Sequence, residues 1–174
     1  ICSYSFDTHG KSMMGLEPSK LAELARNFIP NVIGYGANCG IGASELIGSL
    51  ICFKTSKEND DLLLVAKGNC GVPEFKGDAI VYNGTPKMMA KYARYARDMG
   101  ASIIGGCCGT THVHVKAMSE LLESYKPLIE KIDLDSIIKN LGPMTTGNIA
   151  MINNYLNPGS TKIAPKRKRK RKRR

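Results

Sequence analysis

The chain has 174 residues, 43% of them hydrophobic, which suits one globular domain with a core and excludes a mostly disordered protein. Its formal net charge of +10 includes a C-terminal run of nine basic residues, so the rest of the chain carries only +1 and offers no basic patch. No apolar run reaches the ~18–20 residues that span a bilayer, and we expect a soluble, cytoplasmic protein.

Strand-like and helix-like patterns alternate along the first 125 residues. Short apolar runs typical of buried strands are each followed by a segment with apolar residues at helical spacing. The predicted strands cover residues 1–6, 31–36, 61–67 and 101–106, and the predicted helices cover residues 17–28, 42–53, 85–100 and 112–125. A long loop is expected before the third helix. Because the first strand is already under way at Ile1, we expect the natural chain to begin earlier.

Four strands that each precede a helix indicate βαβ units and a parallel sheet. This spacing fits either a doubly wound sheet or part of an eight-stranded barrel. The unusual segments "DTHG", "GANCG", "GNCGVPE" and "GGCCGTT" all fall where a predicted strand ends. Active sites of parallel α/β folds are built at that edge of the sheet, so we expect the functional site there.

Three of the six cysteines stand out because glycines bracket them at a strand end: Cys39, Cys107 and Cys108. Neighbouring residues of a strand point to opposite faces, so the adjacent pair can converge only where the strand has ended. Three convergent thiolates suit Zn²⁺ and leave a fourth position open, as in catalytic zinc sites. A vicinal disulfide and plain burial are the alternatives. Cys2 and Cys52 lie in apolar patterns and are expected to be small buried side chains.

Five motifs taken in order resemble the zinc-dependent homocysteine S-methyltransferases, which include betaine-homocysteine methyltransferase and the homocysteine module of cobalamin-dependent methionine synthase. These motifs are "SFDTHGKSMMG", "GANCG", "GNCGVPEF", "YNGTP" and "IIGGCCGTT". The resemblance covers about residues 1–125. It implies a (β/α)₈ TIM barrel, of which this chain holds strands five to eight with their helices.

Carried over residue by residue, the resemblance implies that Cys39, Cys107 and Cys108 bind Zn²⁺. Two positions depart from the family pattern. Cys70 stands where the family often has alanine, and we interpret it as a packing residue instead of a fourth ligand. His112 stands where proline commonly follows "GTT", which makes the start of the last helix harder to place.

The resemblance also implies the candidate substrate-binding residues Asp7, Asn38 and Gly106. Asp7 matches an acidic position that holds the amino group of homocysteine in the family. Asn38 matches the asparagine that precedes the first ligand and orients it. His9 and His114 are more typical of hydrogen-bonding surface residues than of metal ligands.

The implied activity is zinc-dependent transfer of a methyl group to the thiolate of homocysteine, which gives methionine. A metal-bound sulfur loses its proton and stays nucleophilic, so the chemistry suits the predicted site. We favour betaine or a similar methylated small molecule as the donor. The alternatives are a methylcobalamin- or methyltetrahydrofolate-dependent homocysteine module, or an inactive zinc-binding fragment, because half a barrel has exposed sheet edges.

The chain divides into two predicted segments. Residues 1–156 are expected to form the methyltransferase domain. Within it, residues 132–156 are expected to include one short helix, and their sequence indicates no function. Residues 157–174 are expected to be a disordered basic tail that ends in the run from Lys166 to Arg174. That run suits weak binding to nucleic acid or an anionic surface, or nuclear import; the alternative is a solubilising end. A function driven by this tail alone is disfavoured.

Overall fold

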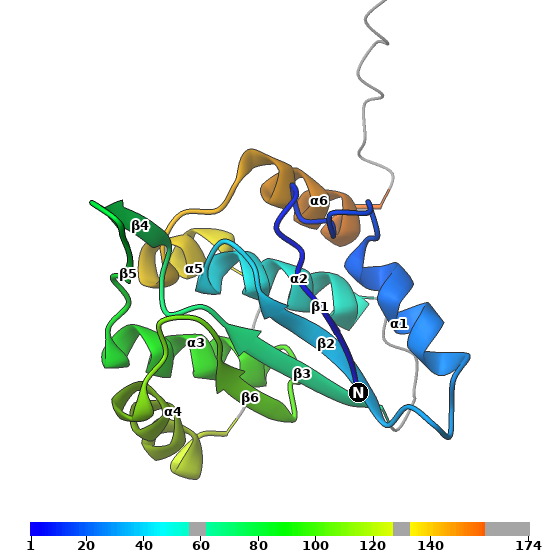
Figure 1. Ribbon diagram of the computed structural model, residues 1–174. Helices are drawn as coiled ribbons and strands as arrows, with labels where there is room; N and C mark the ends of the chain where they lie inside the picture. Colours follow the sequence, from blue (N-terminus) through cyan, green and yellow to red (C-terminus); the bar gives the residue numbers. More distant parts are fainter. Residues whose placement is uncertain (56–61, 127–132, 159–174) are drawn as a thin grey trace, which may run out of the picture.

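The computed structural model in Figure 1 describes residues 1–55, 62–126 and 133–158. Nearly all of the expected basic tail lies outside the described residues. The strands are β1 (Cys2–Tyr4), β2 (Gly34–Cys39), β3 (Leu63–Gly68), β4 (Pro73–Lys76), β5 (Ala79–Tyr82) and β6 (Ile103–Gly106). The helices are α1 (Pro18–Arg26), α2 (Ala43–Thr55), α3 (Pro86–Asp98), α4 (His112–Ser124), α5 (Leu134–Leu141) and α6 (Thr146–Leu156).

The predicted alternation of strands and helices is confirmed, with two differences. The second strand begins and ends three residues later than predicted, because its ladder with β3 continues until Cys39 pairs with Gly68. The expected long loop contains an antiparallel hairpin, β4–β5, which projects from the upper left of Figure 1. The α3 signals are accurate: the Thr85 side chain caps the helix by accepting from the Met88 N–H, and a proline follows it.

The main sheet is parallel and its strands follow chain order, β1-β2-β3-β6. Successive helices also contact one another in order, α1 with α2, α2 with α3 and α3 with α4, and they cover one face of the sheet (Figure 1). A doubly wound sheet would reverse its strand order and carry helices on both faces. The four described strands and their helices show neither feature. The described strands form an open sheet, and the (β/α)₈ barrel to which this chain was expected to supply strands five to eight is not confirmed.

Helix α2 lies at the centre of the core. It is buried along nearly its whole length because the sheet, the flanking helices and α6 all pack against it. The ring of Phe53 contacts Phe6 and Tyr35 edge to face, with centroids 5.9 and 5.3 Å apart, which joins α2 to the first two strands. Cys52 is fully buried as expected, whereas Cys2 is only partly buried on the edge strand. None of the described helices is both long and apolar enough to cross a membrane.

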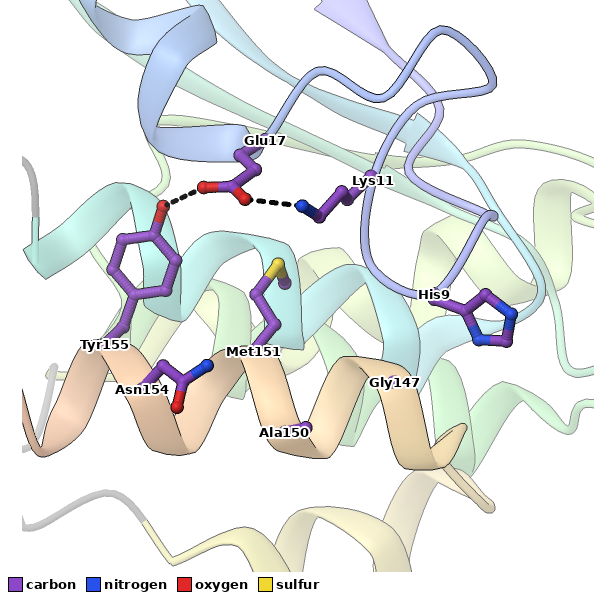
Figure 2. Close-up of a pocket in the computed structure, with 8 residues that line it drawn as sticks. All are labelled: His9, Lys11, Glu17, Gly147, Ala150, Met151, Asn154 and Tyr155. Carbon is purple, nitrogen blue, oxygen red and sulfur yellow. Dashed lines mark hydrogen bonds and ion pairs between the residues drawn. The ribbon is translucent and has the colours of Figure 1, made fainter. Parts of the chain in front are cut away.

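The last two helices, α5 and α6, pack against the helices of the preceding βα units. Asp133 caps α5 by accepting from two backbone N–H groups, and α5 contacts α2 and α3. Helix α6 packs along α2 and also faces the loop between β1 and α1. Between that loop and α6 lies a cavity of about 420 Å³, on whose wall Glu17 binds Lys11 and Tyr155 (Figure 2). These helices therefore complete the core over the outer side of α2.

Candidate metal centre

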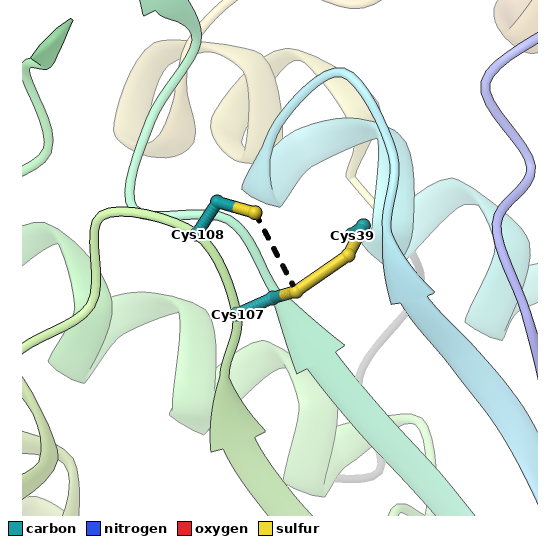
Figure 3. A group of neighbouring side chains, drawn as sticks. All are labelled: Cys39, Cys107 and Cys108. Carbon is teal, nitrogen blue, oxygen red and sulfur yellow. Dashed lines mark hydrogen bonds between the residues drawn. A yellow bond between two sulfur atoms is a disulfide. The ribbon is translucent and has the colours of Figure 1, made fainter. Parts of the chain in front are cut away.

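Three cysteine sulfurs meet at the carboxyl-terminal edge of the sheet (Figure 3). Cys39 is the last residue of β2, while Cys107 and Cys108 directly follow β6. All three sulfur atoms lie within 4.8 Å of one another, and those of the adjacent pair are 3.9 Å apart. Within residues 1–55, 62–126 and 133–158, no other group of three or more His, Cys, Asp or Glu side chains lies close enough to share a metal ion. The three cysteines singled out by the sequence are thus brought together.

The structure joins two of these sulfurs, those of Cys39 and Cys107, in a disulfide (Figure 3). The vicinal disulfide considered from the sequence is therefore wrong, because the bonded pair spans 68 residues of sequence and leaves Cys108 as the free member. A metal binds the thiolate form of cysteine. Metal binding at this cluster accordingly requires the reduced protein.

The backbone at the end of β2 has an unusual conformation. Cys39 has a φ of 53°, in the left-handed region that residues with side chains rarely adopt. Holding a non-glycine residue there costs of order 1–3 kcal/mol, so such residues concentrate at functional sites. Gly40 follows with a φ of 75°, and the chain then enters α2. The turn that ends β2 thus uses the left-handed conformation at both Cys39 and Gly40.

Glycines allow the second cysteine loop to close tightly after β6. A Cβ at Gly106 would lie 2.2 Å from Thr110 Oγ1, and one at Gly109, where φ is 74°, would lie 2.4 Å from Tyr82 Cβ. Neither position has room for a side chain. Gly106, expected as a substrate contact, therefore has a packing reason for being glycine.

The donor set fits a zinc ion. Sulfurs that share one tetrahedral zinc, each at about 2.3 Å, lie about 3.8 Å from one another. The 3.9 Å between the sulfurs of Cys107 and Cys108 agrees with that spacing. Cys108 is exposed and the other two cysteines are partly buried, so one side of the cluster faces solvent. Three thiolates with an open side are the arrangement of a site that accepts one further ligand.

Asn69 connects the two cysteine loops and was not singled out from the sequence. Its side-chain Nδ2 donates to the Gly40 carbonyl (2.6 Å), and its Oδ1 accepts from the Cys108 backbone N–H (3.1 Å). The side chain is 4% exposed. Asn69 lies in the "GNCG" motif, in which only the cysteine was considered from the sequence, because cysteine can bind metal. The role of the asparagine becomes apparent only from the arrangement of the two loops in space.

Tyr82, at the end of the β4–β5 hairpin, is a second residue that the sequence did not identify. Its hydroxyl has a raised pKa, chiefly because it hydrogen-bonds to Cys108 and also because it is partly desolvated. The Tyr82 ring rests against Gly109. The hairpin therefore reaches back to the cysteine cluster, although most of it is exposed.

The other two expected substrate residues lie on the same edge of the sheet. Asp7 is exposed in the loop after β1, where its carboxylate accepts from Thr8 Oγ1 (3.4 Å). Asn38 accepts from the Ser3 hydroxyl and donates to Ser5 Oγ (3.4 Å), so its amide ties the start of the chain to β2. Asn38 thus fixes the strand that carries Cys39, while Asp7 remains open to solvent.

The remaining cysteine and histidines have roles inside the fold. Cys70 is 1% exposed and burial raises the pKa of its thiol, in keeping with the packing role expected for it. His114 is buried, not on the surface as expected, and its ring accepts from the Thr111 N–H at the start of α4. Helix α4 begins at His112, so the missing proline does not displace its start. His9 is exposed, with a φ of 53°.

Residues 1–122 match the family model described as homocysteine S-methyltransferase. The chain belongs to the homocysteine S-methyltransferase family. The match confirms the resemblance drawn from the five motifs and spans all three cysteines of the cluster. It ends within α4, so α5 and α6 lie outside the part of the homocysteine S-methyltransferase chain that the family model covers.

Proposed function

We propose that this chain transfers a methyl group from betaine, or a similar methylated small molecule, to the thiolate of homocysteine, giving methionine. The convergence of three cysteine sulfurs at the carboxyl edge of the sheet supports this proposal most strongly. Membership of the homocysteine S-methyltransferase family supports the substrate. The reaction moves CH₃ from the donor nitrogen to sulfur, and the electron pair of the broken C–N bond stays on the amine that leaves.

Cys39, Cys107 and Cys108 would hold the Zn²⁺ ion as thiolates. When bound, the ion supplies Lewis acidity that lowers the pKa of a substrate thiol and keeps its sulfur in the nucleophilic thiolate form. The solvent-facing side of the cluster, next to Cys108, gives that sulfur access. The rest of the rate enhancement is alignment of sulfur with the methyl carbon, which this chain supplies by fixing the substrate.

Asp7 is the proposed contact for the substrate's ammonium group. Its carboxylate is exposed on a loop at the same edge of the sheet as the cysteines, where an opposite charge stabilises a bound cation. Asn38 is proposed to act indirectly, by holding β2 in register with the first strand through Ser3 and Ser5. Replacing Asp7 by Asn should raise the KM for homocysteine and leave zinc content unchanged.

We also propose that β1, β2, β3 and β6 correspond to strands five to eight of a (β/α)₈ barrel. The chain-order arrangement of the strands and the placement of helices on one face support this correspondence. In such a barrel the two outer strands, β1 and β6, would pair with further strands. The cysteine cluster would then lie at the mouth of the barrel, where the active sites of this architecture are built.

The test combines metal analysis with a donor screen on reduced protein. The parent chain, purified without chelator, should carry about one equivalent of zinc, as expected of one three-thiolate site. Methionine formation from homocysteine is then measured with betaine, with methylcobalamin and with methyltetrahydrofolate in separate reactions. Activity with betaine that disappears in Cys107→Ala supports the proposal. The chain alone could instead bind zinc without turnover and gain activity when four preceding βα units are supplied. That result supports the barrel correspondence but assigns the activity to the larger assembly.

A further inference from the structure

Asn69 occupies the position between the two loops that carry the cysteines. It directly follows β3, the strand that lies between β2 and β6 in the sheet. The cysteine of β2 is therefore on one side of Asn69 and the two cysteines after β6 are on the other. Its side chain is buried, although it lies at an edge where Cys108 is exposed.

The Asn69 amide makes one hydrogen bond in each direction. The donor Nδ2 reaches the carbonyl of Gly40, which is adjacent to Cys39, at 2.6 Å. The acceptor Oδ1 receives the backbone N–H of Cys108 at 3.1 Å. These two partners also fix which way the amide is oriented, since a flipped amide would place donor against donor and acceptor against acceptor.

Backbone bonds strengthen the contact on the Cys108 side. The Cys70 N–H donates to the Cys108 carbonyl (2.9 Å), and the Cys107 N–H donates to the Gly68 carbonyl (2.8 Å). The Cys107–Cys108 loop is thereby fastened to the end of β3 at three points. On the other side, the regular ladder between β2 and β3 ends at the pair Cys39 and Gly68, and the Asn69 bond to Gly40 extends the attachment by one residue.

The required chemistry is specific to an amide. The carbonyl of Gly40 needs a donor and the N–H of Cys108 needs an acceptor, and asparagine supplies both from one short side chain. Aspartate supplies acceptors alone at neutral pH, and leucine supplies neither. Because the Asn69 side chain is buried, a replacement that makes only one of the two bonds leaves a polar group at this position poorly satisfied.

We propose that Asn69 is a positioning residue that holds the loops of Cys39 and Cys108 at the separation that a shared metal ion requires. This inference rests on the proposed metal site, and it adds that the spacing of the sulfurs is set by the protein before the metal binds. Preorganised ligands bind a metal more tightly because the ion does not have to order the loops.

The metal test uses Zn²⁺ and Co²⁺ with the full chain in reducing buffer. Zinc affinity is measured by competition with a chromogenic chelator for the parent and for Asn69→Asp, Asn69→Leu and Asn69→Ser. We expect affinity to fall about 10–100-fold, the usual effect of removing a group that supports metal ligands. The Co²⁺ forms should show weaker thiolate charge-transfer absorption. Asn83→Asp is the matched control, because Asn83 is an exposed asparagine bound to Glu74 on the hairpin, and it should bind zinc as the parent does.

A metal-free measurement separates this inference from the proposed function. Reduced dithiothreitol opens the Cys39–Cys107 disulfide, giving two protein thiols and its own cyclic disulfide, so the equilibrium constant reports the effective concentration of the two thiols. We expect that effective concentration to fall about tenfold in the Asn69 variants and to stay unchanged in Asn83→Asp. If the parent binds no zinc, the metal site fails, and this equilibrium still tests the positioning role.

Thermal melting of the reduced, metal-free proteins shows whether the variants are folded. Variants that melt near the parent temperature but bind zinc weakly and show the reduced effective concentration support positioning. Folded variants with parental zinc affinity and parental thiol equilibrium would overturn it. If all three Asn69 variants are unfolded without metal, Asn69 serves the stability of the whole fold, and the positioning role is likewise rejected.

Discussion

The buried carboxylate of Glu45, in α2, accepts a hydrogen bond from the side-chain amide of Asn148, in α6. The same carboxylate accepts from the Thr145 backbone N–H at the start of α6, and Asn148 Nδ2 also donates to the Glu45 carbonyl (3.1 Å). Glu45 stands in the first turn of the helix that follows Cys39. Through this contact, a helix outside the family match supports the element directly behind the cysteine cluster.

Asn148→Asp should destabilise the protein strongly, because it places a second carboxylate against Glu45 in a site without solvent. An uncompensated buried charge costs about 3–5 kcal/mol. The loss of free energy of unfolding is measured by urea denaturation of the parent and the variant at pH 7. Asn153→Asp, at an exposed position of the same helix, is the control and should change stability little. Equal effects of the two substitutions would contradict this role for Glu45.

The sequence predicted best what depends on local periodicity and on rare residue types. The order of strands and helices, the cap at Thr85 and the convergence of Cys39, Cys107 and Cys108 were all accessible, because apolar spacing and cysteines among glycines are strong signals. The β4–β5 hairpin was missed because its side chains, such as Phe75, are mostly exposed and show no buried alternation.

What the sequence did not reveal depends on contacts between distant segments. Asn69 resembles an ordinary turn residue until Gly40 and Cys108 are found on its two sides. Likewise Asn148 has no local partner, and its contact with Glu45 joins residues 103 positions apart. Polar residues that join distant loops leave no periodic pattern, so pattern analysis cannot distinguish them from surface residues.

Substitution of a cysteine of the cluster should lower zinc content, whereas substitution of the buried Cys70 should not. Cys108→Ser removes one of three sulfurs, and zinc content of the reduced protein should fall well below that of the parent. Cys70→Ser is the control: its thiol is buried, and the backbone N–H of residue 70 still binds the Cys108 carbonyl. It should retain zinc and lose some stability. Zinc measured by mass spectrometry in both variants decides the point, and loss from Cys70→Ser alone would reassign the ligand set.

Thiol reactivity should follow burial. Burial raises the pKa of Cys52 to about 12, so at pH 8 only about one thiol in ten thousand is ionised, whereas Cys108 is exposed. In reduced, metal-free protein, iodoacetamide should label Cys108 rapidly and label Cys52 only after unfolding. Peptide mass spectrometry over time measures both rates. Labelling of Cys52 in the folded protein at the rate of Cys108 would show that α2 opens readily.

The ion pair on the wall of the cavity beneath α6 should make a small, acid-sensitive contribution to stability. The hydrogen bond from Lys11, 2.6 Å from Glu17, is the main reason that the pKa of Glu17 lies below its ordinary value of 4.5. A lowered folded-state pKa means that the stabilisation is fully present above pH 4.5 and is lost as the pH falls through the folded value.

Lys11→Met removes the partner and keeps a side chain of similar length. Because the pair is partly exposed, the loss at pH 7 should stay below about 1 kcal/mol. Urea unfolding of parent and variant is compared at pH 7, 5 and 3, and the difference between them should diminish below pH 4.5 as Glu17 takes up a proton in both. Lys116→Met, which removes an exposed pair with Glu120, is the matched control. A difference that is constant over this pH range would assign the effect of Lys11 to packing against the cavity and not to its charge.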